Sequence, residues 1–249
     1  MAWDFSFDKV SLLLHLDGTN GSTTITDLSG TPKSFSAVSC SISTANSKFG
    51  GASLLLTAPD SYASYGSVHA DFTFSNVDFT VECFYMPTAS PQSNGNVLEP
   101  AWGAVALRHK SGDNKAYFDV SFDGGGSYPV SIPSLSALSL NTFYHLAGVR
   151  SGNTFMFFVD GQLMGSVVNS STIPIYSSGS FIGGYSSGKF ITGHIDEVRV
   201  TKGMARYTNN FTPPDTEFGN ALPPSFIKRI YRPHFQKKST NLPFRHLGI

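Results

Sequence analysis

Charged side chains are scarce in this chain, since Asp, Glu, Lys and Arg make up 14% of its 249 residues. The usual share in soluble domains is about a quarter. Phe and Gly are abundant instead, and no stretch of ten residues combines helical periodicity with few Gly, Pro or β-branched residues. These features argue against a helical bundle and favour short strands joined by tight turns. A chain of this length can bury one large core.

Cysteine is nearly absent, and so are long apolar runs. Cys40 and Cys83 are too few for a disulfide framework, and Cys83 shares a period-two face with Phe79 and Val81, which predicts a buried thiol. The N-terminus has two acids and no basic region, and the apolar run near residues 10–16 is too short to span a membrane. We therefore expect a protein made in a cytoplasm without a signal peptide and without membrane insertion.

Strand patterns recur at short spacing along the chain. Residues 79–85 and 117–122 alternate in period two, and Asp119 is opposed to Phe118. Residues 150–153 separate two apolar runs, and Asp160-Gly161 separates the next two, so three consecutive antiparallel strands are predicted. Many strands without helices predict an all-β fold, a two-sheet antiparallel β-sandwich.

Several motifs occur in a characteristic order. They are Leu-Leu-Leu-His-Leu-Asp-Gly at 12–18, Phe-Gly-Gly-Ala-Ser at 49–53, Asp-Phe-Thr-Val-Glu at 78–82, the segments 143–150 and 157–161, Ile-Gly-Gly at 182–184, and Gly-His-Ile-Asp-Glu-Val-Arg-Val at 193–200. The set resembles the laminin-G-like (concanavalin A-like) jelly roll. The resemblance covers residues 10–211, and implies a lead-in at 1–9 and a Pro-rich basic C-terminal arm at 212–249.

The opening strand, together with Ala-Arg-Tyr-Thr at 205–208 and Phe-Thr-Pro-Pro at 211–214, resembles the version carried on bacteriophage structural proteins. That resemblance implies a non-enzymatic virion protein, a head decoration or a tail- or fibre-associated component at the virion surface, with host-surface glycans as ligands. One alternative is a stand-alone carbohydrate-binding module of a cellular protein. A second alternative is a glycoside hydrolase.

Hydrolysis of a glycosidic bond requires two carboxylates that face one sugar linkage. On a strand, acids two or four residues apart share a face, whereas Asp196 and Glu197 are adjacent and are expected to point to opposite faces. Glu82 alternates with Thr80 and Phe84 and has no acidic neighbour on its face. The sequence therefore predicts binding without catalysis.

The family resemblance implies one structural Ca²⁺ at a sheet rim, where the opening and closing strands place Asp17 and Asp196 side by side. Calcium takes six to eight oxygen ligands, and backbone carbonyls can supply several. The alternative is that Asp17 caps its Asp-Gly turn and that Asp196 accepts hydrogen bonds from backbone amides.

Sugar binding calls for exposed aromatic rings beside polar groups. Trp102, Tyr128 and Tyr185 lie in loop-like segments and are candidates for stacking on a sugar. The alternative for each is ordinary packing at the rim of the core.

The last 33 residues differ in charge from the rest. Residues 217–249 hold six Lys or Arg against one Glu, whereas residues 1–216 hold 11 against 16 Asp or Glu. Basic and aromatic side chains interleave there, which predicts an arm that anchors the protein to capsid or tail subunits or to another copy of itself. Nucleic-acid contact and a solvated terminus are the alternatives, and we expect no nucleic acid. The anchoring residues are Lys228, Arg229, Tyr231, Arg232 and Phe235.

Overall fold

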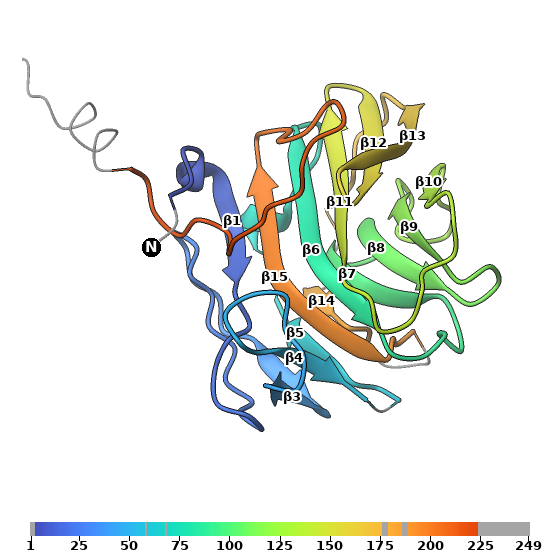
Figure 1. The fold of residues 1–249 in the computed structure, drawn as a ribbon. Coiled ribbons are helices and arrows are strands. Elements are labelled where there is room, and N and C mark those ends of the chain that lie inside the picture. Colours follow the sequence, from blue (N-terminus) through green and yellow to red (C-terminus); the bar gives the residue numbers. More distant parts are fainter. Residues whose placement is uncertain (1–2, 58, 68, 176–178, 186–188, 224–249) are drawn as a thin grey trace, which may run out of the picture.

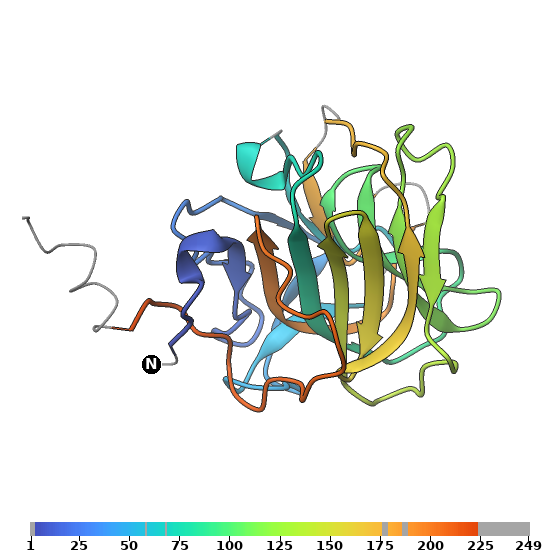
Figure 2. The same cartoon turned by 90° about the horizontal axis from the view of Figure 1, so that it is seen from above.

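The computed structural model describes residues 3–57, 59–67, 69–175, 179–185 and 189–223. Within them two antiparallel sheets lie face to face (Figure 1, Figure 2), which confirms the predicted two-sheet β-sandwich. The helical elements of this part are two 3-10 turns, η1 (Phe7–Lys9) and η2 (Ala70–Phe72). The strands are β1 (Val10–Leu14), β2 (Ser36–Val38), β3 (Cys40–Ser43), β4 (Ser53–Leu56), β5 (Tyr62–Tyr65), β6 (Phe79–Pro87), β7 (Gly95–Ala101), β8 (Val105–Lys110), β9 (Lys115–Val120), β10 (Val130–Pro133), β11 (Tyr144–Ser151), β12 (Thr154–Val159), β13 (Gln162–Val168), β14 (Ser180–Ile182) and β15 (Gly193–Lys202).

The larger sheet has eight strands in the order β13-β12-β11-β6-β15-β4-β3, with β1 also paired to β15. The smaller sheet has seven strands in the order β10-β9-β8-β7-β14-β5-β2. β15, the last strand, is hydrogen-bonded in the larger sheet both to β1, the first strand, and to β6. The first and last parts of the jelly roll must therefore both be present before this sheet can close.

The core lies between the two sheets and follows the predicted alternation. Phe79, Val81 and Cys83 are fully buried and face the smaller sheet. Across the core, Gly148 of β11 lies against the ring of Phe118, where an added Cβ would collide with the ring. Cys83 and Cys40 are both buried and unpaired.

Two of the predicted turns are present. Residues 150–153 join β11 to β12, and Asp160-Gly161 joins β12 to β13. Asp160 has φ 47° and Gly161 has φ 73°, as a tight two-residue hairpin requires, because left-handed turn residues match the twist of the strands. Gly161 also lies directly against the carbonyl oxygen of Phe211, so a side chain at this position has no room.

After β15 the chain returns over the outer face of the eight-stranded sheet, as the orange and red segment of Figure 1 shows. We call residues 203–223 the C-terminal strap. The ring of Tyr207 stacks on Phe211 with centroids 3.6 Å apart, and both rings contact Phe158. Further along, Phe218 is buried against Phe84. The strap therefore covers apolar side chains that the sandwich core does not use.

A buried ionic network fixes the strap and the N-terminus to the sheet. The carboxylate of Glu82 accepts hydrogen bonds from Arg199 Nε at 2.8 Å, Tyr207 Oη at 2.9 Å and His145 Nε2 at 3.1 Å. Asp4 forms ion pairs with Arg199 at 3.2 Å and with Arg206 at 2.7 Å. Burial alone would raise the pKa of Glu82, but Arg199 and His145 together hold it well below its usual range. A fully buried carboxylate is tolerated here because each of its oxygens has a cationic or hydroxyl partner.

The predicted domain boundaries therefore differ from the structure. Residues 212–223 of the strap were expected to belong to an arm at 212–249, yet Phe218 is 3% exposed. The lead-in at 1–9 is not separate either, because Trp3 forms a parallel bridge with Ala221 and Asp4 is buried. The prolines that suggested an arm beyond residue 211 indicate an extended segment, and an extended segment can equally lie along a sheet face of its own domain.

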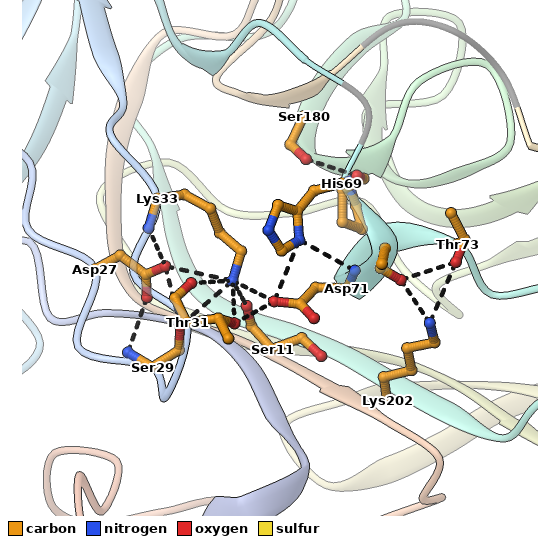
Figure 3. A network of polar contacts seen from close by, with 12 residues as sticks. Ser11, Asp27, Ser29, Thr31, Lys33, His69, Asp71, Thr73, Ser180 and Lys202 are labelled. Carbon is orange, nitrogen blue, oxygen red and sulfur yellow. Dashed lines mark hydrogen bonds and ion pairs between the residues drawn. The ribbon is translucent and has the colours of Figure 1, made fainter.

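A second polar network ties the loop after β1 to η2 (Figure 3). The Lys33 ammonium lies 2.6 Å from Asp71 and 3.6 Å from Asp27, and it donates to the carbonyls of Ser11 and Thr31. Its side chain is 1% exposed. Lys33 thus joins three segments that are distant in sequence.

Among the described residues, the structure contains no helix that could span a lipid bilayer.

Candidate functional site

A pocket with a volume of about 190 Å³ lies where three loops of the seven-stranded sheet meet. Trp102 and Gly103 come from the turn between β7 and β8, and Tyr128 comes from the loop between β9 and β10. Tyr185 and Lys189 come from the segment between β14 and β15. The remaining lining residues are Glu99, Gly124 and Gly125. The structure thus brings the three aromatic residues singled out from the sequence to one place.

The three aromatic rings are partly exposed and are held by their neighbours. Trp102 and Tyr185 meet edge to face, with centroids 6.2 Å apart and an interplanar angle of 72°. Tyr185 also contacts Phe181 of β14 at 5.5 Å. Tyr128 lies over the guanidinium of Arg108, which is 4.4 Å from the ring centroid and donates to its hydroxyl at 2.7 Å. The rings are therefore positioned before any ligand arrives.

Glycines bring the two loops at one side of the pocket together. Gly103 has φ 69° and Gly124 has φ 86°, a region that glycine occupies without strain. A Cβ at Gly103 would lie 3.0 Å from the carbonyl oxygen of Gly124. The Gly124-Gly125-Gly126 run lies in the loop between β9 and β10.

Beneath the aromatic rings, charged side chains form a row across β7, β8 and β9. Arg108 Nη2 lies 3.5 Å from Glu99 Oε1, and Arg108 Nε lies 3.7 Å from Asp119 Oδ2. Lys110 pairs with the same Asp119 at 2.8 Å. Arg108 and Asp119 point away from the core because their strand neighbours, such as Phe118, point into it. The outer face of this sheet is therefore polar below the pocket.

In the described part of the chain, the carboxylate that lines the pocket is that of Glu99, which is 1% exposed. Its oxygens accept hydrogen bonds from Asn96 Nδ2 at 2.6 Å and from the Gly103 amide at 3.0 Å. Burial raises the pKa of Glu99, and the charges of Arg108 and Lys189 and the Gly103 amide oppose that shift only in part. A carboxyl of this kind orients neighbouring groups, and the sequence pattern around Glu99 gave no signal for it.

The acidic corner of β15 differs from the expectation of opposed side chains. A bulge interrupts the register between Asp196 and Arg199, and Glu197 has a left-handed φ of 48°. The residues on both sides, Ile195 and Val198, are in the core, so the bulge turns both carboxylates away from it. Period-two reasoning was wrong here because it assumes a strand without an extra residue.

Both carboxylates at this corner accept hydrogen bonds from other groups of the protein. Asp196 Oδ2 accepts the amides of Lys48 at 2.6 Å and Phe49 at 3.1 Å. Glu197 accepts His15 Nδ1 at 2.7 Å and the Phe218 amide at 2.8 Å. Burial raises the pKa of Asp196 to about 7, and the Lys48 and Phe49 amides lower it only in part.

The donors around Asp17 and Asp196 do not fit a calcium site. Asp196 has all its described contacts with amide N–H groups, which take the lone pairs that a cation needs. Asp17 is exposed, accepts the Ala52 amide and lies against Gly50. Among the described residues, no three His, Cys, Asp or Glu side chains gather to hold a metal ion. The contacts of Asp196 correspond to the alternative in which it accepts backbone amides. Asp17 accepts the amide of Ala52, which lies outside its Asp-Gly turn.

The predicted anchoring residues, Lys228, Arg229, Tyr231, Arg232 and Phe235, lie outside the described residues. Sequence reasoning did not single out Glu99, Arg108 or Lys189, which line or support the pocket. The sequence did indicate that this sheet has a polar outer face, because Asp119 alternates with the apolar residues of its strand. Nothing in the sequence placed β7, β8 and the segment after β14 side by side.

Comparison with solved structures identifies the same fold in several proteins. The binding domain of Paraclostridial Mosquitocidal Protein 1 is 14% identical with a TM-score of 0.64, over 81% of this chain and 50% of that one. Domain 4 of AbnA, an extracellular arabinanase from Geobacillus stearothermophilus, in complex with arabinotriose, is 14% identical with a TM-score of 0.56, over 79% and 94%. The sialidase of Trypanosoma rangeli, in complex with the inhibitor DANA, is 13% identical with a TM-score of 0.54, over 78% and 30%. The chain thus spans half of the mosquitocidal protein chain and under a third of the sialidase.

No curated protein gave a significant sequence match. The family model described as the concanavalin A-like lectin/glucanases superfamily matches residues 60–205, more than half of the chain. That segment runs from β5 through β15 and includes all the residues that line the pocket. This chain therefore belongs to the concanavalin A-like lectin/glucanase superfamily.

Proposed function

We propose that the protein binds glycans, without cleaving them, in the pocket formed by Trp102, Tyr128 and Tyr185. The observation that carries the proposal is the convergence of three partly exposed rings beside the buried carboxyl of Glu99. Sugar rings have apolar faces that pack on aromatic side chains and hydroxyl edges that need polar partners. The volume of about 190 Å³ is below the ~300–1,000 Å³ of drug-sized ligand sites, so we infer a subsite for one sugar ring.

The aromatic side chains of the pocket are held in place by their neighbours, which favours ligand binding. Tyr128 accepts a hydrogen bond from Arg108, and its hydroxyl hydrogen is then free to donate to a sugar oxygen. Rings already held by Arg108 and Phe181 lose little conformational freedom when a ligand binds.

Binding without cleavage is proposed because the acid pair of β15 is occupied. Asp196 and Glu197 accept backbone amides and His15 and have no role left as acid and nucleophile. In the pocket, Glu99 is bonded to Asn96 and Gly103. Incubation with a panel of oligosaccharides, followed by chromatography, should recover them intact, and release of shorter products would contradict this part of the proposal.

The experiment that tests binding is a titration of Trp102→Ala against the matched Trp3→Ala. Trp3 is 48% exposed and lies on the N-terminal bridge to Ala221, away from the pocket residues. A glycan panel first identifies an oligosaccharide that the wild type binds. Trp102→Ala should then lose at least about tenfold in affinity, about 1.4 kcal/mol, whereas Trp3→Ala should bind like the wild type. Equal affinity of all three proteins would refute the pocket.

From the resemblance to bacteriophage structural proteins, we further propose that the protein lies on the surface of a virion. There it would be a head decoration or a tail-associated component. It is supported by the motifs at both ends of the jelly roll and by the basic charge of residues 217–249. In that role the arm would contact capsid or tail subunits while the pocket remains free for host glycans. A stand-alone carbohydrate-binding module of a cellular protein has the same pocket but needs no arm.

Attachment to purified particles separates these two settings. The cut belongs after Pro223, because Phe218 and Ala221 are part of the folded strap. The full chain should co-sediment with particles, and residues 1–223 should not. If both attach equally, the arm is not the anchor.

A further inference from the structure

Among the described residues, the charged side chains that line the pocket are Glu99 and Lys189, and they differ in how their charges are paired. Glu99 is bonded to Asn96 and Gly103 and lies 3.5 Å from Arg108, so its charge is compensated. Lys189 is partly exposed, and its ammonium lies 5.5 Å from the centroid of the Tyr185 ring. Its charge also acts on Glu99, but it forms no ion pair with any described residue. A ligand that enters this pocket therefore meets a partly exposed ammonium that has no ion-pair partner among the described residues.

The backbone of Lys189 is fixed to the sheet. Its carbonyl oxygen accepts the amide of Asn96 on β7. On the other side, Gly184 lies against the same carbonyl, where an added Cβ would be 2.6 Å away. The backbone that carries the Lys189 side chain is therefore fixed at the pocket wall. The ammonium lies beside the ring of Tyr185, on which a sugar can stack.

The geometry points to a sugar that carries a carboxylate as the ligand of this pocket, with Lys189 as the residue that selects it. This inference rests on the proposed function, since it specifies which glycans the same site accepts. A pyranose packed on Tyr185 or Trp102 brings an edge substituent within reach of the ammonium. The ion-pair partner that Lys189 lacks within the described residues would then come from the ligand, and an exposed pair of this kind gives a modest gain that salt weakens.

The test compares acidic sugars with neutral partners of the same shape. One pair is trigalacturonate and its methyl ester, and the other is 3′-sialyllactose and lactose, so that a uronic acid and a sialic acid are tested separately. We expect the wild type to bind at least one acidic member about five- to tenfold more tightly than its neutral partner, with the difference reduced at high salt.

Variants assign the preference to a residue. Lys189→Gln should reduce the ratio of acidic to neutral affinity to within about twofold. Lys189→Arg should keep the preference, and the matched control Lys9→Gln, at an exposed lysine of η1, should behave like the wild type. A preference that persists in Lys189→Gln would overturn the inference.

Failure of the inference can be distinguished from failure of the proposed function. If the wild type binds neutral and acidic sugars equally and Trp102→Ala abolishes both, the pocket binds glycans but Lys189 does not select among them. If no probe of either pair, and no glycan of the wider panel, binds at all, both the pocket and the inference are refuted.

Discussion

Replacement of Lys33 by Met is expected to destabilise the fold strongly, because it removes the cation from a buried cluster (Figure 3). The ammonium faces Asp27 and Asp71 and the carbonyls of Ser11 and Thr31, which would all lose a donor. Removing one member of a buried ion pair costs about 3–5 kcal/mol. We expect a cost at the low end of this range for two reasons. Asp27 keeps hydrogen bonds from Leu13, Ser29 and the Lys33 amide. The Asp71 side chain is 23% exposed, so water can solvate it.

We therefore expect Lys33→Met to lose about 3 kcal/mol, which for a domain of this size lowers the Tm by about 6–12 °C. The assay is thermal and urea unfolding, with Lys202→Met as the matched control. Lys202 donates to Ala70 and Thr73 and has no ion pair in the described chain, so its replacement should cost about 1 kcal/mol or less. Equal losses for the two variants would refute the reasoning.

The pH dependence of the Lys33 cluster gives an independent check. Burial alone would raise the pKa of Asp71, but hydrogen bonds from Lys33 and Thr31 outweigh it and lower the pKa below the ordinary value. A carboxylate with a lowered folded pKa contributes stability above its unfolded pKa and loses it as the pH falls. In Lys33→Met this contribution is smaller, so the variant and the wild type should converge in stability as the solution is acidified below about pH 4.

The remaining predictions concern packing, titration and metal binding. Gly148→Ala should cost about 1–3 kcal/mol by overpacking against Phe118 and be seen in urea unfolding, whereas Gly112→Ala, which has open space, should be neutral; equal effects would contradict the close approach. Burial raises the pKa of Asp196 to about 7, so the folded state binds a proton that the unfolded state releases, and stability should fall as the pH rises from about 4 to 7. Asp196→Asn should make this slope shallower, and an unchanged slope would assign it to other groups. A chelator should leave the Tm unchanged, because amides occupy the oxygens of Asp196, and a clear fall would restore calcium to the acidic corner.

Local patterns were enough to predict the strands and hairpins. Alternation at 79–85 and the Asp160-Gly161 turn act over neighbouring residues, and their outcome depends little on the rest of the chain. The packing of residues 212–223 depends on what lies beneath them. The outward-facing Phe84 and Phe158 gave no indication in the sequence that the strap would cover them.

The bulge in β15 explains why the acidic corner was misjudged. One extra residue at Glu197 reverses the facing of the side chains that follow, and Asp196 and Glu197 end up on the same side. The pocket was anticipated only as separate aromatic residues, since its assembly from three loops is a property of strand order.

The most direct test of the central claim uses the two indole N–H signals of Trp3 and Trp102 in an NMR titration with the oligosaccharide that binds best in the panel. Sugar packed in the pocket should shift the Trp102 indole signal in a saturable way and leave that of Trp3 in place. Saturable binding that leaves the Trp102 signal unchanged would contradict the account and place the glycan elsewhere on the protein.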